Sequence, residues 1–217
     1  MPSPSANTRP DDDSVDLDAL PETVASGSTL LVATPEPIDG YALPLRIADR
    51  YARSDECRLV VTATVDAERT IRQQLSLSPS PAPGFGVVDA TGDEHLLSLY
   101  QEYPTVYLPY PGELAHVSLA LWELETALSP SRPNPHLIFR SLSPLLAEDS
   151  LERVTNVLGR LIEQRRSSGS LTVLGIEYTA HDEHTMAALR ALADAIVWVD
   201  TSPDARLELD YRRIRNR

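Results

Sequence analysis

The residues with the clearest potential for chemistry form a short loop directly after an apolar run. The run is Thr29–Thr34, and the loop is Pro35–Ala42, placed where a phosphate-binding loop has the pattern G-x-x-x-x-G-K-[ST]. In such a loop, backbone N–H groups, a lysine and a metal-binding hydroxyl group surround the phosphates. This loop keeps only the second glycine of the pattern, Gly40.

The other positions of the loop oppose phosphate binding. Pro35 stands for the first glycine, Tyr41 for the lysine and Ala42 for the hydroxyl residue. Pro35 and Pro37 have no backbone N–H to donate. The carboxylate of Asp39 also brings negative charge to the place of the phosphate. We therefore expect no tight binding of Mg-ATP at this loop.

Three further polar residues follow apolar runs. Asp89 precedes a Thr-Gly sequence, and turn formation explains it better than catalysis. His181 and Asp182, with His184, could offer metal ligands, but their spacing matches no specific metal motif. Capping of the following helix is the favoured interpretation of this cluster. Asp89, His181 and Asp182 remain candidates for a polar pocket, and no metal site is predicted.

The charge balance is acidic and contains no lysine. The 217 residues include 32 Asp and Glu against 19 Lys and Arg, a formal net charge of -13, and every one of these cations is an arginine. Carboxylates hold hydration water at high ionic strength, and arginine is a weakly hydrated pairing partner. The balance therefore predicts a halophilic host. A genome rich in G and C, which favours arginine codons, is the alternative explanation.

The composition excludes several classes of protein. One cysteine, Cys57, cannot form an internal disulfide or supply a two-cysteine zinc or redox motif. The acidic balance makes nucleic-acid binding through basic charge improbable. No apolar run approaches the roughly 18 residues of a membrane span, and the N-terminus lacks the pattern of a signal peptide. We expect a soluble, cytoplasmic protein without a membrane span.

Five short apolar runs alternate with helical patterns along the chain, as in strands buried on both faces. The runs are residues 29–34, 59–63, 86–88, 136–139 and 171–176. After them, residues 195–200 and 206–214 flank a turn, and the second segment alternates apolar and polar side chains. The pattern predicts an α/β fold of three layers. We expect a mostly parallel sheet covered by helices on both faces, with a C-terminal antiparallel hairpin.

Local composition sets the expected boundaries. Residues 1–26 are rich in Pro, Ser and Asp and predict a disordered acidic arm. Residues 27–217 are then a single domain. Within it, Asp149 and Glu152 have the spacing of a capping box and predict the start of a helix.

The order of these segments resembles the RecA/KaiC-like domain of archaea, which is related to RadA and belongs to the P-loop ATPase superfamily. Three stretches carry the resemblance: Leu137–Leu146, Ser170–Leu174, and Leu189 through the hairpin, with its Leu-Ala-Asp sequence at Leu192–Asp194. The resemblance covers residues 28–215 and implies a RecA-like sheet.

The resemblance also implies two carboxylates that this chain lacks. Relatives hold Mg²⁺ through a Walker B aspartate at the end of the fourth strand, where Arg140 and Ser141 stand here. They polarise the attacking water through a glutamate after the second strand, where this chain has Thr64 and Val65. We expect Arg140 to bridge to a nearby carboxylate such as Asp89.

Together with the missing lysine and hydroxyl group, these departures imply a degenerate, non-catalytic domain, because phosphoryl transfer relies on positioning and charge. The expected function is that of a regulatory or scaffolding protein in signalling in a halophilic archaeon. It would use neither ATP nor Mg²⁺ and would bind an active KaiC-like ATPase or a second copy of itself. The alternative is a nucleotide sensor or weak ATPase in which Arg140 contacts phosphates with help from His181 and Asp182. A DNA-repair accessory role is disfavoured by the net charge.

Overall fold

The computed structural model describes residues 15–37, 42–53, 55–78, 84–92, 103–108, 114–128, 135–202 and 206–215. The strands are β1 (Thr29–Thr34), β2 (Arg58–Thr62), β3 (Phe85–Asp89), β4 (Thr105–Tyr107), β5 (His136–Phe139), β6 (Thr172–Glu177), β7 (Ala195–Thr201) and β8 (Leu207–Arg213). The helices are α1 (Leu43–Tyr51), α2 (Ala67–Leu77), α3 (Leu114–Leu128), α4 (Ser143–Glu148), α5 (Leu151–Ser167) and α6 (Glu183–Leu192), with a 3₁₀ turn, η2, at Tyr178–Ala180.

The strands form one sheet in the order β4-β3-β2-β5-β6-β1-β7-β8. Neighbouring strands are parallel except β7 and β8, which pair antiparallel. Every residue of β1, β2, β3 and β5 is buried. Burial on both faces explains why these strands are continuous apolar runs rather than alternating ones. The predicted parallel sheet and C-terminal hairpin are confirmed.

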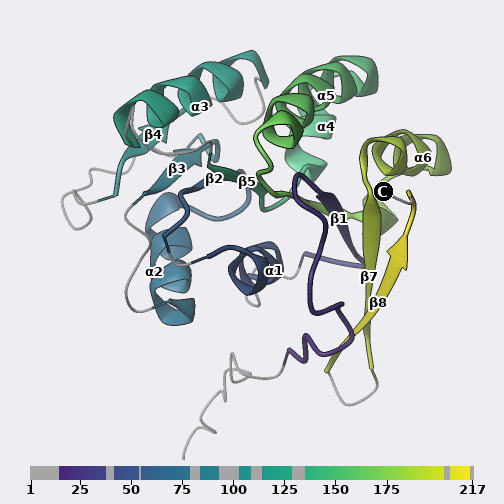
Figure 1. Ribbon diagram of the computed structural model, residues 1–217. Helices are drawn as coiled ribbons and strands as arrows, with labels where there is room; N and C mark the ends of the chain where they lie inside the picture. The colour runs from purple at the N-terminus through teal and green to yellow at the C-terminus, as the bar shows by residue number, and fades with distance from the viewer. Residues whose placement is uncertain are drawn as a thin grey trace, which may run out of the picture.

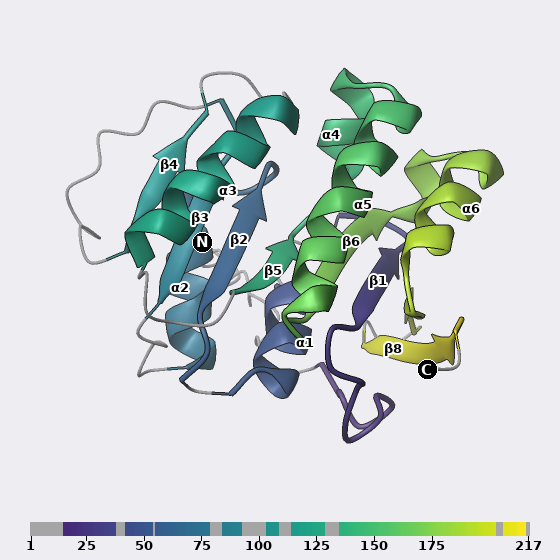
Figure 2. The same cartoon turned by 45° about the horizontal axis from the view of Figure 1, so that its top comes forward.

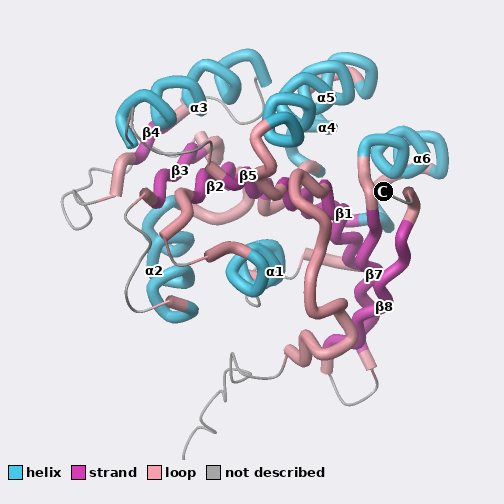
Figure 3. The backbone as a smooth tube through the Cα atoms, viewed as in Figure 1, coloured by secondary structure: helices cyan, strands magenta, loops and turns pink. Residues whose placement is uncertain are grey.

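Helices cover both faces of the sheet, which gives three layers (Figure 1). One face carries α3, α4, α5 and α6, whose apolar side chains share one core cluster with the sheet. The other face carries α1 and α2, which pack in a second cluster. Figure 2 shows α3, α5 and α6 side by side over the strands, and Figure 3 shows the sheet as the middle layer.

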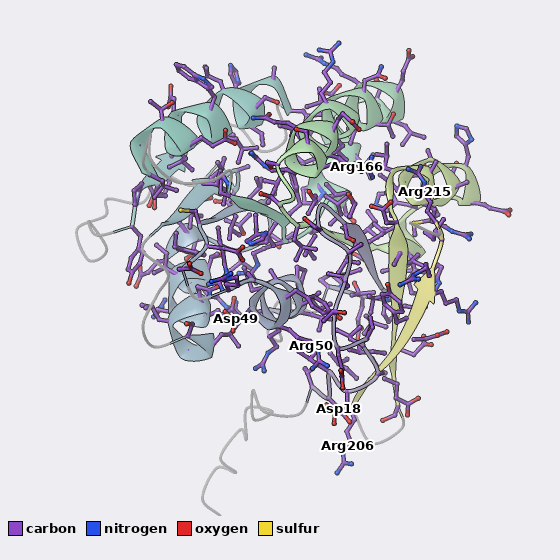
Figure 4. The ribbon with its side chains drawn as sticks, viewed as in Figure 1. Asp18, Asp49, Arg50, Arg166, Arg206 and Arg215 are labelled. Atoms are coloured by element: carbon purple, nitrogen blue, oxygen red, sulfur yellow. The ribbon has the colours of Figure 1, made fainter. Side chains whose placement is uncertain are left out.

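The segment before β1 packs against the sheet. Of the predicted arm over residues 1–26, residues 1–14 lie outside the described residues, whereas Leu20 is buried at 3% exposure in the core beside α1. The backbone oxygens of Leu20 and Pro21 accept hydrogen bonds from Arg50 (3.4 Å) and Tyr51 (2.8 Å) of α1. Figure 4 labels Arg50 on the side of α1 that faces this segment. The described part of the domain therefore begins before residue 27.

One helix start differs from the prediction. The side chain that caps α5 is Ser150, whose Oγ accepts from the backbone N–H of Arg153 at 3.3 Å. Asp149 instead ends α4 and forms an ion pair with Arg153 at 3.5 Å. The predicted capping box of Asp149 and Glu152 is therefore wrong. The short helix α4, which the sequence pattern did not reveal, places Asp149 in the link between two helices.

Two charged contacts tie α5 to its neighbours. Arg165 is fully buried and pairs with Glu125 of α3. Arg166 pairs with Asp194 at 3.1 Å, and Asp194 also accepts from the backbone N–H of Thr29 at 2.9 Å. The aspartate of the Leu-Ala-Asp sequence thus joins α5, β1 and the start of β7, which is a structural role.

Candidate functional site

A cavity lies at the carboxyl ends of β1, β2, β5 and β6, where ligands bind in open sheets of this kind. Its volume is about 120 Å³. The lining comes from β1, the loop after it, the start of α1 and the ends of β2, β5 and β6: Val32, Thr34, Pro37, Ala42, Pro44, Thr64, Arg140, Ser141, Ser143, Pro144, Gly175, Ile176 and Glu177. The sheet order therefore brings the loop after β1 together with the end of β5, as a RecA-like arrangement requires.

The start of α1 is poorly suited to an anion. Asp39, Gly40 and Tyr41 lie outside the described residues, so the structure places only the two ends of the predicted loop. Ala42 precedes α1 with a φ of 47°, in the left-handed region that disfavours a side chain. Pro44 in the first turn has no N–H.

The next backbone donors are already used. The N–H groups of Leu45 and Arg46 both donate to the carbonyl oxygen of Ala42, at 2.9 and 3.0 Å. A helix N-terminus binds phosphate through backbone N–H groups that have no partner within the helix. The first turn of α1 therefore offers few donors toward the cavity.

Arg140 occupies the end of β5 and is buried at 6% exposure. Its Nη1 donates to Thr70 Oγ1 at 2.8 Å and to Gln73 Oε1 at 2.7 Å, both on α2. The side chain at the end of β5 is thus a buried cation held by hydrogen bonds to a neighbouring helix. Such a group repels a divalent cation instead of binding it.

The predicted bridge from Arg140 to Asp89 is wrong. Asp89 is buried at the end of β3, and its Oδ2 accepts from the backbone N–H of Ala67 at 2.7 Å. Its Oδ1 accepts from the N–H and the hydroxyl group of Thr91, at 3.0 and 2.6 Å. The carboxylate is therefore occupied by the first turn of α2 and by its own turn, and β2 lies between β3 and β5.

The neighbouring strand, β6, closely approaches the backbone at the end of β5 at Gly175. A Cβ atom at this position would lie 2.1 Å from the carbonyl oxygen of Arg140, so only glycine fits. The carbonyl oxygen of Gly175 accepts from the N–H of Leu142 at 2.8 Å. This contact fixes the turn that carries Arg140 and Ser141 into α4.

A small polar cluster lies beside the cavity. Ser143 Oγ accepts from the N–H of Glu177 at 3.2 Å and lies 3.0 Å from His181 Nε2, while Ser141 Oγ accepts from the N–H of Ser143 at 3.3 Å. Burial lowers the pKa of His181, against the opposing effect of Glu177 and Asp182. His181 is thus favoured in its neutral form.

The cluster contains a Ser–His contact but not a catalytic triad. A nucleophile–base pair needs a third group that orients the base. Within the described residues no carboxylate bonds to Nδ1 of His181, and Asp182 instead caps α6 by accepting from the N–H of Thr185 at 2.8 Å. Among the described residues, the Ser143–His181 contact therefore lacks the third group of a triad.

The three candidates for a polar pocket do not come together. Asp89 ends β3, whereas His181 and Asp182 follow β6, and β2 and β5 lie between these strands. The capping interpretation of Asp182 is confirmed. Within the described residues no group of three or more His, Cys, Asp and Glu side chains could hold a metal ion.

Sequence reasoning missed the partners of Arg140 and the role of Ser143. Thr70 and Gln73 are three residues apart in a sequence that was predicted to be helical, so both lie on one face of α2. That spacing was the available signal. Ser143 could not be connected to His181, because 38 residues separate them in the chain.

Comparison with protein families gives one match over most of the chain. Residues 27–199 match the model described as "Family of unknown function (DUF7504)". The chain belongs to this family. In the comparison with curated proteins, no sequence matches this chain.

Three solved structures share this fold. The flagellar accessory protein FlaH from Methanocaldococcus jannaschii is 16% identical, with a TM-score of 0.57 over 88% of this chain and 79% of its own. KaiC-like protein PH0186 from Pyrococcus horikoshii OT3 is 12% identical, with a TM-score of 0.53 over 88% and 80%. Uncharacterized protein PH0321 from Pyrococcus horikoshii, solved with an unknown peptide, is 13% identical, with a TM-score of 0.58 over 88% and 85%. The DUF7504 chain therefore has a RecA/KaiC-like fold.

Within the described part of the chain, no helix is both long and apolar enough to traverse a membrane.

Proposed function

We propose that this chain is a non-catalytic RecA/KaiC-like domain that regulates or scaffolds other proteins by binding them. The observation that carries the proposal is Arg140, a buried cation fastened to Thr70 and Gln73 where a metal-binding carboxylate would stand. Catalysis of phosphoryl transfer depends on Mg²⁺ and on charges placed around the phosphates. A fixed cation at the metal position and a first turn of α1 with few free donors both oppose that chemistry.

The structural neighbours fit a role in protein binding. One is a flagellar accessory protein, and another was solved with a peptide. For this chain, the partner is proposed to be an active KaiC-like ATPase or a second copy. Copurification from the host in high salt, followed by identification of the bound proteins, would reveal such a partner.

Titration with Mg-ATP tests the absence of catalysis. We expect no heat of binding at millimolar nucleotide and no phosphate release above the rate without protein, for the wild type and for Arg140→Ala. Arg69→Ala is the matched control, because Arg69 is an exposed arginine of α2. Circular dichroism establishes that each variant is folded before the titration.

A second candidate function has one observation in its favour. Arg140 lines the cavity and could contact a phosphate group there, as in a nucleotide sensor or weak ATPase. Sub-millimolar affinity that is lost in Arg140→Ala and kept in Arg69→Ala would support this second function and contradict the first.

A further inference from the structure

The strand β8 lies at one edge of the sheet. Among the described residues, its outer side is paired at one point, an isolated parallel bridge between Val15 and Leu207. Figure 1 shows the rest of β8 at the margin of the molecule, and Figure 4 shows Asp18 and Arg206 together at the end where the bridge lies. Within the part of the chain that the structure describes, most of this edge is therefore unpaired.

The hydrogen bonds at the two ends of the hairpin determine which residues face that edge. Ser202 N donates to Arg206 O, and Ile214 N donates to Asp194 O, each at 2.8 Å. Hydrogen-bonded pairs in an antiparallel ladder alternate with pairs that exchange no bonds. Even-numbered residues of β8 therefore bond to β7, and odd-numbered residues direct their backbone groups outward. The outward set consists of Leu207, Leu209, Tyr211 and Arg213, and Leu207 is the one that bridges to Val15.

The side chains of β8 divide into two faces. Leu207, Leu209 and Tyr211 pack on the core beside α1. Glu208, Asp210 and Arg212 are exposed on the other face. Arg212 donates twice to Asp210 Oδ2 within the strand, at 2.8 and 2.6 Å. Of the devices that prevent strand addition, β8 has no proline and no bulge but does carry charged side chains, so the strand that pairs with it must have a matching charge pattern.

We propose that a second copy of the chain adds to this edge, with the two β8 strands antiparallel and Tyr211 opposite Tyr211 of the second copy. In this register Leu209 lies opposite Arg213 of the second copy and Tyr211 lies opposite Tyr211. The outward N–H and C=O groups of these residues can then exchange hydrogen bonds. Asp210 and Arg212 then lie opposite Arg212 and Asp210 of the second copy, in pairs that exchange no backbone bonds. Such pairs bring the Cα atoms to about 4.5 Å, close enough for opposite charges to attract.

The neighbouring registers are less favourable by the same charges. A shift that places Leu209 opposite Tyr211 of the second copy keeps two opposite-charge pairs, Glu208 with Arg212, but puts Asp210 opposite Asp210. The shift in the other direction puts Arg212 opposite Arg212, and like charges directly opposite are unfavourable. A shift by a single residue would move the apolar side chains of one copy to the solvated face. The charge pattern of β8 therefore favours the register with Tyr211 opposite Tyr211, which has opposite-charge pairs and no like-charge pair among Glu208, Asp210 and Arg212.

The net charge determines the conditions under which the dimer forms. Each copy carries a formal charge of -13, so two copies repel each other in dilute salt. At about 1 M salt the Debye length is about 3 Å, and only the charges that touch across the edge still interact. We expect the dimer in molar KCl and a shift to monomer in dilute buffer.

Paired charge reversals test the register by analytical ultracentrifugation in molar KCl. Asp210→Arg places arginine opposite arginine and is expected to weaken self-association by more than about tenfold. Arg212→Asp places aspartate opposite aspartate, with the same expected result. An equimolar mixture of the two variants restores both opposite-charge pairs and should dimerise. Because Asp210→Arg lowers the net negative charge, a dimer limited only by general repulsion would be strengthened by it.

A proline substitution tests the edge itself. Tyr211→Pro removes an N–H that points away from β7, so it should abolish the dimer and keep the melting temperature of the monomer within a few degrees of that of Tyr211→Ala, which loses the same core packing. Tyr211→Ala is the control, which keeps the N–H and should still dimerise. A monomeric wild type in molar KCl, or a dimer unaffected by these changes, would overturn the proposal. The proposed dimer rests on the proposed function and names one surface through which the chain binds a partner. The Mg-ATP titration measures nucleotide binding, so its result is the same whether or not the dimer forms.

Discussion

Arg140 and His181 lie close to the same cavity and are held in different ways. Arg140 is a buried cation whose hydrogen bonds include two to neutral oxygens, Thr70 Oγ1 and Gln73 Oε1. His181 is partly buried against Ser143. The sequence revealed the cation at position 140 but not these acceptors, because they are 70 and 67 residues away in the chain. A neutral hydroxyl group and an amide give no charge signal that a sequence pattern can detect.

The environment of His181 predicts a pH dependence of stability. Burial lowers the pKa of His181 below its usual value of 6.5, although Glu177 and Asp182 oppose the shift. Below about pH 6.5 the unfolded chain therefore binds a proton more readily than the folded protein. The contribution of neutral His181 to the free energy of unfolding is fully present above this pH and is lost as the pH falls toward the folded pKa.

Urea unfolding across this pH range measures the effect. His181→Gln should flatten the slope of the free energy of unfolding against pH, whereas His184→Gln, at an exposed position of α6, should leave it unchanged. An NMR titration reads the pKa of His181 directly, and a value above 6.5 would contradict the prediction.

At the scale of elements, the strands could be predicted from the sequence, but the segments that connect β5, α4 and α5 could not. The predicted runs at residues 29–34 and 136–139 coincide with β1 and β5, because full burial leaves an uninterrupted apolar signal. The turn from β5 into α4 depends on Gly175 in another strand, which no local pattern contains. The short helix α4 that follows this turn has Asp149 at its C-terminal end, which displaces Asp149 from its predicted capping role.

Alanine substitutions at two glycines distinguish a position without room for a side chain from a position with room for one. Gly175→Ala should lower the free energy of unfolding by about 3 kcal/mol, because its Cβ would overlap the backbone of Arg140. Gly159→Ala lies within α5, where the nearest atom is 3.9 Å from the added Cβ, and it should raise stability by roughly 0.5–1 kcal/mol. Denaturant unfolding of the two variants would measure both values. Equal changes in the free energy of unfolding would contradict the expectation that the close approach of β6 to the backbone of Arg140 leaves no room for a side chain at position 175.

At the scale of the whole molecule, the acidic charge balance predicts that the stability of the folded state depends on salt concentration. Repulsion among the charges that make up the net -13 should destabilise the folded state in dilute buffer. Between about 0.1 M and 1 M KCl the Debye length falls from about 10 Å to about 3 Å, so the melting temperature should rise. Sucrose, which favours burial without screening charge, is the control and should raise it less. A melting temperature independent of KCl would instead favour codon bias as the origin of the composition.

The contacts of Arg140 also determine what a single substitution there can achieve. Arg140→Asp would take the donor away from Thr70 and Gln73 and leave a buried carboxylate facing them. Burial of a charge without a partner of opposite charge is costly. A metal site at the end of β5 would therefore need changes in α2 as well, so no single substitution at this position would create one.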